Sequence, residues 1–180
     1  MFVDPIISII ASFVIGGLFL LSGVHKAQNQ SVFRYTLANY GIPQLLLLPA
    51  GIVITSMELL IAILILLSII GLVNIGMMLG LGLLVVYTGL LSTVYLTGRS
   101  FDCGCNFGGS TVPIGGWHIA RNLILIAVAA LYFLPQAGRE IFWLDYLSAI
   151  TATLMITLTL IIIETMKSNN AHFSKSRETI

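Results

Sequence analysis

Two cysteines, Cys103 and Cys105, are separated by a single glycine and are the only cysteines in the chain. They lie in a polar, glycine-rich stretch, Gly98–Gly116, between two apolar segments. The thiolate is the reactive form of cysteine, and a second thiol nearby resolves a mixed disulfide before it escapes. A Cys-Gly-Cys ring is tighter than a Cys-x-x-Cys ring, and a strained disulfide is more oxidising and more labile. The pair therefore indicates thiol–disulfide chemistry.

Three interpretations of the pair stay open at this point: a redox-active disulfide, a static structural bridge, or two buried thiols. Arg99 is close enough in sequence to stabilise a thiolate, whereas Asp102 would oppose it. A metal site is the weakest interpretation, because two thiolates require further ligands. His118 is the nearest candidate, and one histidine does not complete a site.

The composition excludes a soluble globular protein. Mean hydropathy is +1.04, and 58% of the residues are hydrophobic whereas only 8% are charged. A soluble domain carries about 25% charged residues, so lipid must be the main solvent of this chain. With 180 residues and a formal net charge of +1, the sequence predicts one membrane bundle with no basic surface for nucleic acid.

Five segments are apolar over about the 20 residues that a helix needs to span a bilayer. They are Pro5–Val24, Gln44–Leu72, Asn74–Leu96, Trp117–Leu134 and Trp143–Ile163. Because open strand edges are not tolerated in lipid, each is predicted to be helical. The predicted fold is therefore all-α, a polytopic membrane bundle of about five transmembrane helices. Residues 1–166 form the integral membrane domain, and residues 167–180 form a polar C-terminal tail.

The second and third segments are hard to separate from the sequence. We place the break at Gly71–Asn74, where a glycine and an asparagine interrupt two aliphatic runs. The third segment is rich in small residues, which allow helices to pack closely in membranes. These are Gly76, Gly80, Gly82 and Gly89.

Glu58 is the single charged residue in the second and third segments. An ionisable group at that depth usually faces a partner or a cavity. Its candidate partners, Lys26, His25 and Arg121, lie near helix ends on one side of the predicted bundle. Glu58 is predicted to be part of a structural ion pair, a protonated carboxyl group, or a proton acceptor beside the thiols.

Polar residues also mark the ends of two predicted spans. His25 and Lys26 follow the first span and are predicted to extend to the lipid headgroups, although His25 could instead act as a base near the thiols. Arg121 and Asn122 begin the fourth span, where a helix N-terminus would lower a thiolate pKa if the preceding loop folds back over it. Between the first two spans, residues 26–42 are predicted to form an interfacial amphipathic stretch.

Parity over five spans places the 26–42 connection, the cysteine segment and the C-terminal tail on one face of the membrane. Seven of the eight Lys and Arg residues lie on that face, and Arg139 alone lies on the other. Positive residues favour the cytoplasm. The charge distribution therefore favours a cytoplasmic cysteine face.

Five features of the sequence form one pattern: Ser22–Gly23–Val24–His25–Lys26, Phe33…Leu37…Tyr40…Pro43, Glu58, Asp102–Cys103–Gly104–Cys105–Asn106–Phe107–Gly108 and Trp117…Arg121–Asn122. With them the sequence resembles, over roughly residues 5–165, the MauE family of methylamine-utilisation proteins, which is itself similar to DoxX-like membrane proteins. The family pattern Asp-Cys-Gly-Cys-Phe-Gly is matched with Asn106 as a one-residue insertion, which leaves both thiols in place.

The resemblance implies a multi-pass protein of the bacterial inner membrane with a four-helix core, as in DoxX-like proteins and, by analogy, vitamin K epoxide reductase. It implies a role in maturing the disulfide-rich small subunit of methylamine dehydrogenase, alongside a thioredoxin-like partner called MauD. That subunit matures in the periplasm, so the resemblance places the cysteine face outside, against the charge distribution. Both orientations stay open.

We expect Cys103 and Cys105 to form a redox pair that passes electrons between a thioredoxin-like protein and either a quinone or another thiol. Glu58, His25 and Arg121 would manage protons and thiolate charge. The protein would then be a thiol–disulfide oxidoreductase, with a quinone as its candidate cofactor by analogy. The alternative is a non-catalytic membrane anchor or chaperone for the thioredoxin-like partner. A small-solute transporter is disfavoured because no inverted repeat is evident.

Overall fold

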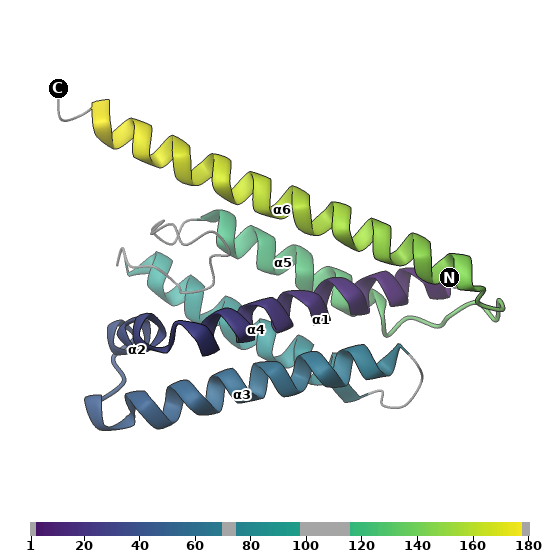
Figure 1. Cartoon of the computed structure of the whole chain (residues 1–180), viewed down its shortest axis with the longest axis horizontal. Coiled ribbons are helices and arrows are strands. Elements are labelled where there is room, and N and C mark those ends of the chain that lie inside the picture. The colour runs from purple at the N-terminus through teal and green to yellow at the C-terminus, as the bar shows by residue number, and fades with distance from the viewer. Residues whose placement is uncertain (1–2, 70–74, 98–115, 178–180) are drawn as a thin grey trace.

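The structure is a computed structural model of the chain, and it describes residues 3–69, 75–97 and 116–177. These ranges are largely helical (Figure 1). The helices are α1 (Pro5–Gln28), α2 (Gln30–Asn39), α3 (Gln44–Ser68), α4 (Ile75–Leu96), α5 (Gly116–Leu131) and α6 (Trp143–Arg177).

The predicted all-α membrane bundle is confirmed. Three whole helices, α1, α3 and α4, are long and apolar enough to cross a membrane, and so is the Trp143–Ile163 part of α6. The fifth apolar helix, α5, has 16 residues, or about 24 Å at 1.5 Å per residue, which is shorter than a ~30 Å hydrocarbon layer. The predicted spans overlap these helices, but their ends differ: α1 continues to Gln28 and α6 to Arg177, whereas α3 ends at Ser68 and α5 at Leu131.

The four-helix core is also present in the described residues. Buried apolar side chains from α1, α3, α4 and α5 form one continuous cluster. Helix α6 packs mainly against α1 and runs along the outside of this core (Figure 1). Of the α6 residues between 143 and 163, only Ala149 is buried. The core that can position a site is therefore built without α6.

The bundle begins with a well-defined helix start. Pro5 occupies the first turn of α1, where its missing N–H removes no hydrogen bond. The Asp4 carboxylate caps this turn by accepting from the backbone N–H of Ile6 at 3.0 Å. These two residues fix where α1 begins.

Small residues bring α1, α3 and α4 close together. A Cβ on Gly23 would lie 2.8 Å from the Leu59 side chain, and a Cβ on Gly76 would lie 2.5 Å from the backbone of Leu64. The packing role expected for the α4 glycines is thus confirmed for Gly76 and also for Gly80, where a Cβ would lie 2.8 Å from Ile65. It is wrong for Gly82 and Gly89, where a Cβ would meet nothing within 4 Å.

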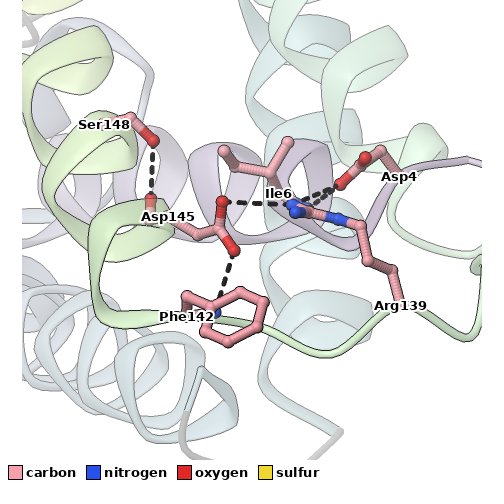
Figure 2. A network of polar contacts seen from close by, with 6 residues as sticks. All are labelled: Asp4, Ile6, Arg139, Phe142, Asp145 and Ser148. Atoms are coloured by element: carbon pink, nitrogen blue, oxygen red, sulfur yellow. Dashed lines mark hydrogen bonds and ion pairs between the residues drawn. The ribbon is translucent and has the colours of Figure 1, made fainter.

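One end of the bundle is held together by polar contacts between the N-terminus, the α5–α6 connection and the start of α6. The Arg139 guanidinium lies 3.3 Å from the Asp4 carboxylate and 3.1 Å from that of Asp145, as Figure 2 shows. The hydrogen bond to Asp145 raises the pKa of Arg139. The backbone N–H of Val3 donates to the carbonyl of Pro135 at 3.0 Å. The N-terminus and this connection share one face, as parity predicts.

The first connection forms a short helix at the opposite end. Helix α2 buries Phe33, Thr36 and Leu37 and packs against α3 near Gly51. The predicted amphipathic stretch is therefore a helix whose apolar side covers the end of the α1–α3 pair. The break predicted at Gly71–Asn74 lies outside the described residues, and α3 and α4 are two separate helices on either side of it.

Candidate functional site

Glu58 lies in the middle of α3 and is fully buried, with an exposed fraction of 0%. One oxygen, Oε1, accepts from the Lys26 ammonium and from the Tyr87 hydroxyl. The other, Oε2, accepts from the Ser22 hydroxyl at 3.3 Å. Because a buried charge is tolerated only when it is paired and hydrogen-bonded, these three donors are what allow a carboxylate at this depth. They link α1, α3 and α4.

Lys26 is the ionic partner of Glu58. The prediction that Lys26 extends to the lipid headgroups is wrong, because its side chain is only 2% exposed. Its ammonium also lies 5.1 Å from the ring centroids of Phe33 and Tyr87, within the range of a cation–π interaction. Helix α2 folds back over the end of α1 and supplies Phe33, so the ammonium is enclosed instead of reaching the membrane surface.

The same cluster lines a cavity of about 290 Å³. Lys26 and Tyr87 form part of its wall, together with Arg121 and Asn122 of α5. The rest of the wall is mostly apolar and aromatic, and includes Phe19, Phe33, Tyr40, Leu84, Leu91 and Leu125. The cavity is therefore an apolar space with a polar cluster of cationic, hydroxyl and amide groups in its wall.

Three polar residues of α5 face the interior. His118, Arg121 and Asn122 are all buried, with at most 8% of their surface exposed. They lie in the first two turns of α5, directly after the segment that carries the two cysteines. The sequence left the rotation of this helix undetermined, and the packing of the bundle turns this polar face inward.

The site residues predicted from the sequence fall into three groups. Glu58 and Arg121 lie at the buried cluster and in the cavity wall, respectively. His25 is half-buried and is not among the cavity-lining residues. Cys103 and Cys105 lie outside the described residues.

Sequence reasoning missed Tyr87 as a member of this site. Its hydroxyl contacts Glu58 from α4, and its ring covers Lys26. The sequence does contain a signal for Tyr87, which is its position. Tyrosines in membrane helices concentrate at the two interfaces, whereas Tyr87 lies in the middle of an apolar segment. A tyrosine hydroxyl at that depth needs a hydrogen-bond partner, and Glu58 was the one carboxylate at a similar depth.

No group of three or more His, Cys, Asp or Glu residues that could hold a metal ion occurs in residues 3–69, 75–97 and 116–177. The buried cluster has one carboxylate, and its donors already occupy both oxygens. What it offers chemically is a set of hydrogen-bond donors and a charge pair beside an apolar cavity.

Comparison with known proteins gives one match. The model of the family described as methylamine utilisation protein MauE matches residues 4–135, which is more than half of the chain. No curated protein and no solved structure matches significantly. The matched region contains α1 to α5, the buried cluster and the cysteine segment, and it ends before α6.

Proposed function

Because this chain belongs to the MauE family, we propose that its part in methylamine utilisation is that of a thiol–disulfide relay in the bacterial inner membrane. Cys103 and Cys105 are its redox pair. Its client is the disulfide-rich small subunit of methylamine dehydrogenase, reached through a thioredoxin-like partner. The chain is a multi-pass membrane protein, which suits a relay held at the surface where such a partner arrives.

The observation that carries this proposal is the place of the cysteine segment between α4 and α5. The helices on both sides of it contribute to one polar cavity, α4 through Tyr87 and α5 through Arg121 and Asn122. The two cysteines lie in the segment of the sequence that connects these two helices, which supports a part for the cavity in the chemistry of the thiols. A simple lipid anchor has no need of a buried ion pair, a cavity and a cysteine pair together.

The relay step follows from thiol–disulfide exchange. A thiolate of the partner attacks one sulfur of the Cys103–Cys105 disulfide, forming a mixed disulfide and releasing the other sulfur as a thiolate. The partner's second thiol then displaces the first sulfur, so the partner leaves oxidised and the pair remains as a dithiol. Two electrons and two protons have moved to the relay. In this scheme Arg121 stabilises thiolate charge, and Glu58 and His25 are the candidate proton acceptors.

Substitution of the cysteines tests this function. Cys103→Ser and Cys105→Ser should each abolish maturation, measured as active methylamine dehydrogenase and as correctly paired cysteines in its small subunit. Ser100→Ala in the same segment is the matched control and should leave maturation unchanged. Full maturation by the Cys103→Ser/Cys105→Ser double variant would overturn the proposal and favour a non-catalytic anchor.

A further inference from the structure

Asn122 lies in the cavity wall without a hydrogen-bond partner in the described part of the chain. Its side chain is only 5% exposed, and it lines the cavity from α5. A buried carboxamide that makes no hydrogen bond is unfavourable, and each such group in a native structure calls for an explanation. A molecule in the cavity that accepts a hydrogen bond from the amide would satisfy it.

Lys26 offers a second donor to the same space. An ammonium group carries three N–H donors, and in the described residues Glu58 is the one hydrogen-bond acceptor that it contacts. Its ammonium also faces the rings of Phe33 and Tyr87, which line the cavity too. The wall therefore holds at least two groups that can donate to an oxygen atom of a bound molecule.

The character of the cavity narrows the class of ligand. Its wall is mostly aliphatic and aromatic, so the body of the ligand must be apolar, and a planar ring suits aromatic neighbours. Glu58 already neutralises the charge of Lys26, so beside Lys26 an uncharged carbonyl acceptor fits better than another buried anion. The cavity also lies within a membrane bundle, which favours a lipid-soluble ligand.

We propose that this cavity binds a lipid-soluble quinone, with a ring carbonyl accepting hydrogen bonds from Asn122 and Lys26. The cavity itself supports quinone binding, and a redox role for the bound quinone rests on the proposed relay. In that setting the Cys103/Cys105 dithiol is reoxidised by the quinone. Two S–H bonds break, one S–S bond forms, and the two electrons and two protons convert the quinone to a quinol.

The test is binding of a short-tailed ubiquinone analogue to the purified full-length protein in lipid nanodiscs. We expect saturable binding that Asn122→Leu weakens roughly tenfold, as loss of a hydrogen bond to a buried acceptor predicts. The thermal unfolding midpoint of Asn122→Leu without quinone should be unchanged or raised, because an unpaired buried amide has been removed. A merely structural Asn122 would instead lower it. Asn39→Leu, the same exchange away from the cavity, should bind like wild type.

Two further arms keep the test independent of any one variant. Leu84→Phe fills the cavity and should abolish binding, whereas Leu79→Phe on the exposed side of α4 should not. A long-chain fatty acid should compete poorly. No saturable quinone binding, or displacement by fatty acid at lower concentration than by quinone, would overturn the proposal. The Cys103→Ser/Cys105→Ser variant should bind quinone normally, so a failed relay and a failed quinone site are distinguishable.

Discussion

Lys26 of α1 and Glu58 of α3 form an ion pair inside the helical bundle, with exposed side-chain fractions of 2% and 0%. Two other helices take part in it, since α4 adds the Tyr87 hydroxyl and α2 adds the Phe33 ring. Removing two charges from water is costly unless both are paired and hydrogen-bonded. This cluster therefore couples the positions of four helices to one another, and it lies at the wall of the cavity.

The pair predicts a strong coupling between two substitutions. Lys26→Met or Glu58→Leu alone should lower the free energy of unfolding by about 3–5 kcal/mol, because each leaves an uncompensated buried charge. The Lys26→Met/Glu58→Leu double variant should lose much less than the sum of the two. Denaturant-induced unfolding of all four proteins in one detergent measures this cycle. Losses that add to within about 0.5 kcal/mol would contradict the pairing.

The Tyr87 hydroxyl predicts a smaller and separable effect. Tyr87→Phe removes a donor to the buried carboxylate but keeps the ring over Lys26, so it should cost about 1.5–3 kcal/mol of stability. Tyr35→Phe is the matched control, because Tyr35 is 71% exposed on α2 and its substitution should change little. The thermal unfolding midpoints of both variants in the same lipid nanodiscs test this. Equal midpoints would mean that the hydroxyl contributes nothing to the cluster.

Two glycines of α4 are predicted to respond in opposite directions to the same exchange. Gly76→Ala places a Cβ 2.5 Å from the α3 backbone, so the helices must separate, at a cost of about 1–3 kcal/mol. Gly82→Ala meets nothing within 4 Å and should be neutral or stabilising by up to about 1 kcal/mol, because alanine is the better helix former. Thermal unfolding of the two variants in one lipid environment compares them directly. The same change in both would contradict the α3–α4 contact.

The helical spans could be predicted from hydropathy alone, because lipid leaves the backbone few alternatives. The ends of α1 and α6 could not. Helix α1 continues past Val24 to Gln28 with Lys26 paired inside the bundle, which apolar length does not reveal. Helix α6 continues to Arg177 through a polar stretch in which neither proline nor glycine follows Gly138, so nothing in that stretch breaks a helix.

The candidate site was only partly predictable, for a similar reason. Glu58 was conspicuous as the single charge in two apolar segments, and Lys26 was among its three candidate partners. Which partner it takes depends on the rotation of α1 and on α2 folding back over it, and both are set by tertiary packing. Asn122 was visible in the sequence, but its burial in a cavity wall depends on how α5 is rotated. Composition and spacing carry no information on such rotations.

The charge distribution and the family predict opposite orientations of the protein in the membrane. The charge distribution favours a cytoplasmic cysteine face, whereas a periplasmic client requires the opposite face. The proposed relay predicts that a membrane-impermeant maleimide labels Cys103 and Cys105 in intact cells after reduction. A Ser100→Cys substitution in the Cys103→Ser/Cys105→Ser background gives a matched probe of the same segment. Protection of both probes until lysis would place the segment in the cytoplasm and exclude a periplasmic client.

The redox state of Cys103 and Cys105 during methylamine dehydrogenase maturation tests the central claim most directly. Cells would be quenched with acid at intervals after induction, and free thiols would be alkylated with a reagent that shifts the mass of each labelled chain. A working relay should show both the dithiol and the disulfide form, and the dithiol should accumulate while the client is being oxidised. A pair that stays fully oxidised at every time point, with the client maturing normally, would contradict the relay and leave the cysteines a structural bridge.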